Sequence, residues 1–158
     1  MEFALFESHV RYAIVAWGAS SISNTEKVLR LQKRAIRCLG ELQYKDSCRA
    51  TFSQLKILTV INLYVKEVIL YVLTTNYPKL GDWHKYNTRN GSKYKLESHR
   101  LNMFSNKPSY KGAKFYNLLP ENLKKSDMTM KKFKSELTIW LQNNPFYTIK
   151  EFIDWKNL

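Results

Sequence analysis

Four cations share one side of a predicted helix in the first third of the chain. They are Arg30, Lys33, Arg34 and Arg37. Spacings of three and four residues place side chains on one face of an α-helix, so like charges here lie close together. Such a row is either a solubilising outer face or a ridge that contacts phosphate groups. The spacing alone leaves both interpretations open.

A second basic region lies in the middle of the sequence. Residues 85–134 hold 13 basic and 3 acidic side chains, and the whole 158-residue chain has a formal net charge of +13. The candidate phosphate contacts in this region are Lys85, Arg89, Lys93, Lys95 and Arg100. An excess of positive charge repels itself unless a polyanion neutralises it, so nucleic acid is the expected partner.

The residues that catalysis would need are scattered. A two-metal polymerase or hydrolase brings several carboxylates together, whereas the aspartates here stand alone. The aspartates are Asp46, Asp82, Asp127 and Asp154, and the histidines are His9, His84 and His99. No histidine has a cysteine or carboxylate neighbour at zinc-ligand spacing, and no Walker A loop occurs. We therefore expect no metal, no cofactor and no catalysis by this chain alone.

Compartment and membrane signals are few. Cys38 and Cys48 form no Cys-x-x-Cys pair, which fits a reducing compartment, and Cys38 should be inert packing at a helix end. The apolar run 57–73 is interrupted by Asn62, Lys66 and Glu67, so no membrane span is predicted. The first residues lack the features of a secretory signal. An intracellular protein, nuclear or cytoplasmic, is expected.

Hydrophobic periodicity predicts a mainly α protein that begins with a helical bundle over residues 1–75. Apolar residues at helical spacing predict a helix over residues 1–17, ending at Gly18. A capping box of Ser23 and Glu26 predicts a second helix to residue 39. Its expected apolar face consists of Val28, Leu31, Ala35 and Leu39. A short helix over 46–55 and a central helix over 59–75, capped by Thr59, should follow.

The rest of the chain should form a linker and a second helical segment. Residues 76–110 are rich in polar and turn-forming residues and read as a basic, partly mobile linker, with Asn90-Gly91 as the turn of a short β-hairpin. Residues 111–158 should be helical again, over 113–119 and 130–141. Thr148 and Glu151 form a further capping box, which opens a last turn that buries Phe152.

Taken in order, several short strings resemble the C-terminal thumb and tail of jockey-like non-LTR retrotransposon reverse transcriptases. The strings are Ser8-His9-Val10, Tyr12, Ala16-Trp17-Gly18, Leu31-Gln32-Lys33-Arg34-Ala35-Ile36-Arg37, Leu55-Lys56-Ile57-Leu58-Thr59, Asn62-Leu63-Tyr64, Tyr86-Asn87-Thr88-Arg89-Asn90, His99-Arg100-Leu101, Tyr110-Lys111-Gly112, Tyr116-Asn117-Leu118-Leu119-Pro120, Lys132-Phe133-Lys134 and Phe146-Tyr147. Each string is weak by itself, but their order and spacing are specific, and together they cover nearly the whole chain.

The resemblance implies a function and a set of contacts. In such proteins an endonuclease and a palm with a Tyr/Phe-Ala-Asp-Asp motif precede the thumb, which grips the template and primer duplex. This chain resembles only the thumb and tail, so Lys33, Arg34 and Arg37 are the implied backbone contacts. The chain departs from the family at Lys56, where relatives often have Gly, and at Val60-Ile61, where they often have Leu-Pro. Both departures fall at the turn before the central helix.

The expected function is that of a non-catalytic fragment of an RNA-directed DNA polymerase, which binds RNA or DNA without sequence specificity. Two other functions are alternatives. The chain could be an inert or host-adopted structural relic of the element, with residual charge. It could also be a helix-turn-helix DNA-binding protein, but Gln32 is the one side chain on the basic helix suited to reading base edges. The missing palm of the parent polymerase is a further expected partner.

Overall fold

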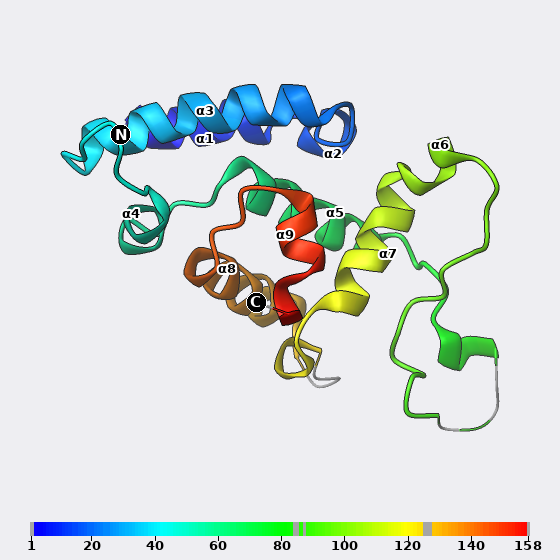
Figure 1. Ribbon diagram of the computed structural model, residues 1–158. Helices are drawn as coiled ribbons and strands as arrows, with labels where there is room; N and C mark the ends of the chain where they lie inside the picture. The colour runs from blue at the N-terminus through cyan, green and yellow to red at the C-terminus, as the bar shows by residue number, and fades with distance from the viewer. Residues whose placement is uncertain (1, 84–85, 87, 125–127, 158) are drawn as a thin grey trace. The chain divides into compact units, whose positions relative to one another are not determined.

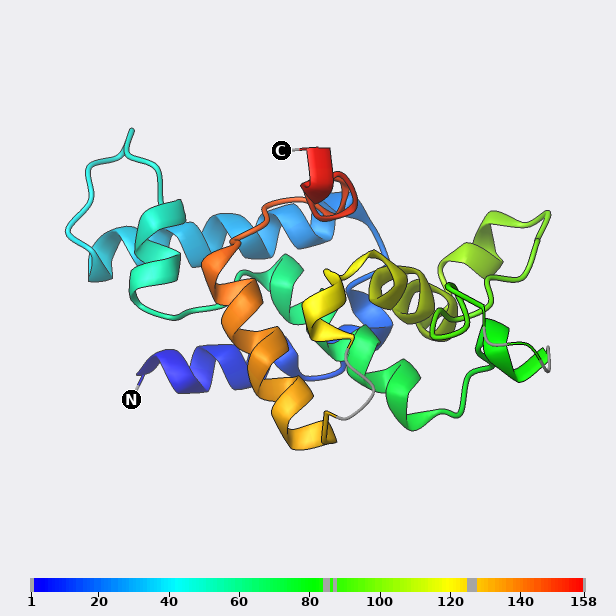
Figure 2. The same ribbon diagram turned by 90° about the horizontal axis from the view of Figure 1, so that it is seen from below.

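The protein is mainly α-helical, as the sequence predicts. The computed structural model describes residues 2–83, 86, 88–124 and 128–157, with the side chains of those between residues 7 and 156. Figures 1 and 2 show the helices in two views. They are α1 (Glu2–Arg11), α2 (Ile14–Trp17), α3 (Ile22–Leu39), α4 (Arg49–Gln54), α5 (Val60–Thr74), η1 (Leu80–Trp83), α6 (Asn102–Ser105), α7 (Pro108–Leu118), η2 (Glu121–Leu123), α8 (Met130–Asn143), α9 (Ile149–Ile153) and η3 (Trp155–Asn157).

The chain divides into two compact units. One consists of residues 1–64 together with 137–158, and the other of residues 65–136. The expected segment divisions after residues 75 and 110 do not coincide with these units, and they stay predictions about which stretches fold independently.

In the first unit, the predicted helix over residues 1–17 is wrong as a single element. Ala13 has a left-handed backbone (φ 51°) and separates α1 from α2. The indole Nε1 of Trp17 donates to the carbonyl of Tyr12 at 2.9 Å, which satisfies a group that the break exposes. Helix α2 ends at Gly18 as expected, and a Cβ there would lie 2.3 Å from Cδ2 of Tyr64, so the position favours glycine. Periodicity continues through such a break and cannot show it.

The start of α3 also differs from the prediction. Ser21, not Ser23, is the N-cap, and its hydroxyl accepts from the backbone N–H of Asn24 at 3.1 Å. The helix therefore begins at Ile22, and the predicted capping box of Ser23 and Glu26 is not formed. Serine is preferred at an N-cap, and the sequence has one at both position 21 and position 23. The serine that caps the helix is Ser21, whose backbone is extended.

The buried face of α3 is not the one expected. The buried residues are Thr25, Leu29, Gln32 and Ile36. Leu31 and Leu39 of the predicted face are each 55% exposed. Gln32 decides the orientation, because its amide nitrogen donates to the carbonyl of Leu58 at 2.9 Å and its oxygen accepts from the N–H of Val60 at 2.8 Å. These bonds satisfy buried backbone groups that would otherwise lack partners.

Helix α4 packs beside the C-terminal half of α3. Ile36, Cys48 and Phe52 form a buried cluster there, with Leu42 and Ile57 packed against it. Gly40 caps α3, and its hydrogen faces Thr51 so closely that a Cβ would lie 2.7 Å from the threonine methyl. The short helix predicted over 46–55 is thus confirmed, with bounds at residues 49 and 54.

The C-terminal residues complete the first unit by bonding to the start of α5. Thr59 caps α5 as predicted, accepting from the N–H of Asn62 at 3.1 Å. The buried Asn62 amide donates to the carbonyls of Leu141 and Asn144, at 2.6 and 2.9 Å. Thr59 in turn donates to the carbonyl of Phe146 at 2.7 Å. These bonds join segments about eighty residues apart in sequence.

Helix α9 begins after the predicted cap Thr148, but only one of the two hydrogen bonds of the predicted capping box forms. The N–H of Glu151 donates to the hydroxyl of Thr148 at 3.0 Å, while the carboxylate accepts from Tyr147 N–H at 2.8 Å rather than from Thr148. Phe152 is fully buried, as expected. Among the described helices, none is long and apolar enough to cross a membrane.

In the second unit, α7 lies directly on α5. The helix begins at Pro108, five residues before the predicted start, since proline is well suited to a first helical position. A Cβ on Gly112 would lie 2.1 Å from the carbonyl oxygen of Val68 and 3.1 Å from Cβ of Val72. Only glycine fits such a close approach of two helices.

Part of the expected linker is hydrogen-bonded into the second unit. Lys79 and Tyr94 form an isolated antiparallel bridge, and Leu80 N–H donates to Lys93 O at 2.9 Å. Asn117 of α7 binds both backbone groups of Tyr94, at 2.9 Å each. The pairing is hairpin-like, but no described glycine has a positive φ, so Asn90-Gly91 is not the tight turn predicted. Mobility of this segment before binding stays a prediction.

Candidate nucleic-acid interface

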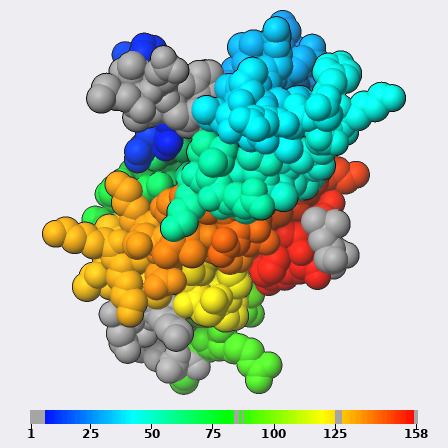
Figure 3. Space-filling model, turned by 90° about the vertical axis from the view of Figure 1, so that its left-hand side faces the viewer, coloured from blue at the N-terminus to red at the C-terminus, as the bar shows by residue number. Residues whose placement is uncertain are grey.

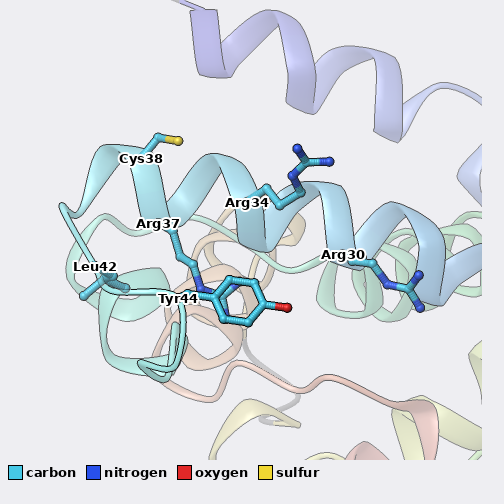
Figure 4. A pocket seen from close by; sticks show the side chains of 6 residues that line it. All are labelled: Arg30, Arg34, Arg37, Cys38, Leu42 and Tyr44. Atoms are coloured by element: carbon cyan, nitrogen blue, oxygen red, sulfur yellow. The ribbon is translucent and has the colours of Figure 1, made fainter.

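Three of the four predicted cations of α3 line one hollow. Arg30, Arg34 and Arg37 border a cavity of about 770 Å³ together with Cys38, Leu42 and Tyr44. Figure 4 shows Arg37 running toward the ring of Tyr44, while Arg30 and Arg34 extend outward from α3 in different directions. Two helical turns separate the first arginine from the last, about 10 Å along the axis. The hollow therefore offers guanidinium groups along a length that spans several phosphates.

The arginines of the hollow carry charge that is not neutralised. Within the described residues, no carboxylate lies within ion-pair distance of Arg30, Arg34 or Arg37. One Nη atom of Arg37 donates to the carbonyl of Asp46 at 3.5 Å, a neutral acceptor. An excess of guanidinium groups in one place is costly for the free protein and favourable toward an anion, which guanidinium binds through paired N–H groups.

The loop after α3 holds an exposed tyrosine at the hollow. Glu41 has a left-handed backbone (φ 50°), and Leu42 N–H donates to Arg37 O at 3.0 Å, which closes the helix end. The carboxylate of Asp46 then accepts from the N–H of Gln43 at 2.9 Å. Tyr44, at the tip of this turn, is 87% exposed. In Figure 3 this segment (cyan) forms part of the surface.

Tyr44 was not among the candidate residues from the sequence. A signal was present, because this aromatic residue stands between Gln43 and Lys45, and Cys48 is the one apolar residue three or four positions away. An aromatic ring in such surroundings has little core to join. Its closeness to Arg37, whose guanidinium carbon lies 5.8 Å from the ring centroid, depends on the turn and could not be read from spacing.

Lys33 belongs to a different cluster from the arginines. Its Nζ lies 3.6 Å from the ring centroid of Tyr147, and the guanidinium of Arg49 lies 4.1 Å from the same centroid. Burial lowers the pKa of Lys33 and raises the pKa of Tyr147 to about 12. Arg49 also pairs with Glu151 at 2.8 Å. Lys33 thus holds α3 against the C-terminal segment, although the helical spacing grouped it with the three arginines.

The second basic region occupies the other unit. Arg89 and Arg100 are exposed, whereas Lys93 and Lys95 are partly buried. The Nζ of Lys95 lies 3.5 Å from the ring centroid of Trp83, which is 62% exposed. Lys85 lies outside the described residues. The structure thus pairs one of these candidates with an exposed aromatic ring and leaves two arginines open to solvent.

Residues that could hold a metal or act as a nucleophile are not gathered into a site. Over the part of the chain that the structure describes, no group of three His, Cys, Asp or Glu side chains could hold a metal ion. His99 stacks on Phe104 at a centroid distance of 5.2 Å. Cys38 is exposed and Cys48 is buried, so the prediction that Cys38 is inert packing was wrong. The reason is the rotated face of α3 described above.

We compared the chain with protein-family models, with curated proteins and with solved structures. None of the three comparisons gave a match. The residues and their geometry are therefore the basis for assigning a function.

Proposed function

We propose that this protein is the thumb and tail part of a non-LTR retrotransposon RNA-directed DNA polymerase, and that it binds the RNA or DNA backbone without sequence specificity. One observation carries the proposal: three arginines line one hollow, and none of them has a carboxylate within ion-pair distance in the described residues. The sequence resemblance supplies the polymerase context. Arg30, Arg34 and Arg37 are the proposed phosphate contacts, with Arg89 and Arg100 as a second set.

The proposed fragment is non-catalytic alone and acts with the palm of its parent polymerase in the nucleus or cytoplasm. The pure chain should extend no primer on any template in Mg²⁺ or Mn²⁺, because the carboxylates of a two-metal centre are scattered along the sequence. Template-dependent incorporation of labelled nucleotide would overturn this part of the proposal.

A helix-turn-helix reader of DNA sequence is disfavoured by Gln32. Its side chain is 1% exposed and both ends of the amide are bonded to backbone. It therefore cannot reach base edges without breaking the fold. The relic hypothesis predicts that the basic residues bind no nucleic acid. A binding measurement therefore distinguishes it from our proposal.

The salt dependence of binding tests the proposal. Affinity for a duplex and for a single strand should fall steeply as salt rises, since bound phosphates release counterions. Changing Arg30, Arg34 and Arg37 to Gln should reduce the slope of log K against log salt by about 0.7 to 0.9 for each phosphate that the variant no longer binds. Lys33→Gln should leave the slope nearly unchanged, because its ammonium rests on Tyr147.

A variant with the same change in charge is the matched control. Lys131, Lys132 and Lys134 lie on α8 and are exposed, so their triple change to Gln removes three positive charges without touching the hollow. If both triple variants reduce the slope equally, net charge rather than the arginine site explains binding. If the wild type shows no salt-dependent binding, the relic hypothesis is favoured.

A further inference from the structure

The exposed ring of Tyr44 contributes little to the core of the free protein. Its side chain is 87% exposed, and the turn that carries it is closed by bonds of its neighbours: Asp46 to Gln43, and Leu42 to Arg37. The guanidinium carbon of Arg37 lies 5.8 Å from the ring centroid, a weak contact at an exposed site. An aromatic ring held in water at the border of a cationic hollow is suited to contact a ligand.

The combination of ring and guanidinium groups favours one form of nucleic acid. In a duplex the bases are stacked on each other and their faces are covered, so a side chain beside the backbone meets only phosphate and sugar. In a single strand the bases can turn outward and stack on aromatic side chains while basic residues follow the phosphates. The hollow presents both features, with the ring of Tyr44 beside Arg37 and with Arg30 and Arg34 along α3.

We propose that this hollow binds single-stranded RNA or DNA, with one unstacked base on the ring of Tyr44 and the adjoining phosphates on Arg30, Arg34 and Arg37. The inference rests on the proposed function and narrows it from backbone binding in general to a single-strand site. Since every base has a flat π face, stacking on Tyr44 is tolerant of sequence. No bidentate base contact is required of any residue in the hollow.

Oligonucleotides with and without bases test the proposal. The affinity of the full chain is measured, at one salt concentration, for a short oligothymidylate and for an abasic oligomer of the same length and charge. The wild type should prefer the oligomer with bases. Tyr44→Ala should reduce that preference by about 5- to 150-fold, since one stacked base contributes roughly 1 to 3 kcal/mol. Tyr44→Phe keeps the ring and should keep the preference.

Tyr12→Ala is the matched control, because Tyr12 is 81% exposed and its hydrogen bonds to Ser8 and Trp17 are made by its backbone. It should leave the preference unchanged. Tyr44→Ala should also leave the affinity for a thymidine-adenosine duplex unchanged, and an equal loss there would show that Tyr44 does not contact an unstacked base.

The outcomes separate this inference from the proposed function. If Tyr44→Ala retains the full preference for bases while salt-dependent binding persists, the single-strand site is wrong and backbone binding stands. If the wild type binds neither oligomer nor duplex, both are wrong. Circular dichroism of Tyr44→Ala should match that of the wild type, as expected for a side chain outside the core.

Discussion

At the scale of single residues, several helices are followed by a residue other than glycine whose backbone is left-handed. Glu41 (φ 50°) follows α3, and Lys56 (φ 55°) follows α4. After Lys56, the N–H of Ile57 donates to Phe52 O at 3.0 Å, and Gln142 donates to Lys56 O at 2.6 Å. A left-handed backbone costs an L-residue roughly 1 to 2 kcal/mol. These bonds hold Lys56 in that conformation despite the cost.

Lys56→Gly should therefore stabilise the protein. Glycine adopts a positive φ without the clash of a Cβ, and part of the gain is offset by its greater freedom in the unfolded chain. We expect the free energy of unfolding to rise by about 0.5 to 1 kcal/mol, measured by urea denaturation. Lys56→Ala is the control, since alanine keeps the Cβ and removes the same charge. A glycine variant no more stable than the alanine variant would contradict this account.

The sequence pointed to Lys56 but not to the partners of Lys33. The proposed resemblance drew attention to residue 56, and the positive φ found there is a backbone conformation that favours glycine. The contact of Lys33 with Tyr147 joins residues more than a hundred positions apart. No local pattern carries such information. The spacing of the four cations correctly predicted that they lie on one helix, but it could not show which of them face solvent.

At the scale of elements, most helices were predictable and their faces were less so. The caps at Thr59 and Thr148 and the helices that follow them agree with the sequence. On α3, however, two sets of positions share the helical period, and in the more apolar set Leu31 and Leu39 are exposed while Val28 and Ala35 are only partly buried. Burial of Gln32 selects the other set, because Leu58 and Val60 need its amide. That requirement arises from a distant segment.

Gly112→Ala should strongly destabilise the packing of α7 on α5. In an isolated helix, alanine in place of glycine is favourable by about 1 kcal/mol. Here the added methyl would lie 2.1 Å from the backbone oxygen of Val68, so the helices must separate. We expect a decrease of about 1 to 3 kcal/mol in the free energy of unfolding, measured by urea denaturation. The control is Lys114→Ala on the exposed side of α7, and a neutral or stabilising Gly112→Ala would refute the close approach.

At the scale of the whole molecule, one buried and one partly buried tyrosine make the free energy of unfolding sensitive to alkaline pH in both units. Burial raises the pKa of Tyr94 in one unit and of Tyr147 in the other to about 12, from an ordinary value of 10. A raised pKa in the folded state means that the neutral form is favoured on folding. Its contribution is complete below pH 10 and is lost as the pH rises from 10 to about 12.

We therefore expect the free energy of unfolding to fall between pH 10 and about 12, as tyrosinate absorbance appears. Tyr94→Phe removes one of the groups responsible, so its stability should decline less over that interval. Urea denaturation at a series of pH values measures both slopes. Below about pH 9 the two chains should differ only by a constant. Parallel curves above pH 10 would exclude Tyr94 as a cause.

The helical class and the distribution of charge were predictable for the whole chain, but the return of residues 137–158 to the first unit was not. Asn62 and Thr59 bind carbonyls in the 141–146 segment, and Arg49 binds Glu151. Each of these polar residues reads locally as a cap or a surface group. Their partners are fixed by the course of the chain between them, which periodicity does not describe.

The return of residues 137–158 to the first unit also fixes the order in which hydrogen-bond partners appear during synthesis. Asn62 leaves the ribosome about eighty residues before the carbonyls it binds, so its amide and the start of α5 wait for their partners. At the usual 5 to 20 residues per second, the wait is roughly 4 to 16 seconds. During it the Asn62 amide and the Thr59 hydroxyl lack the carbonyls that they bind in the finished unit. A nascent chain stalled before residue 141 has emerged should consequently be cut by protease near the start of α5 faster than a nascent chain stalled after residue 158 has emerged.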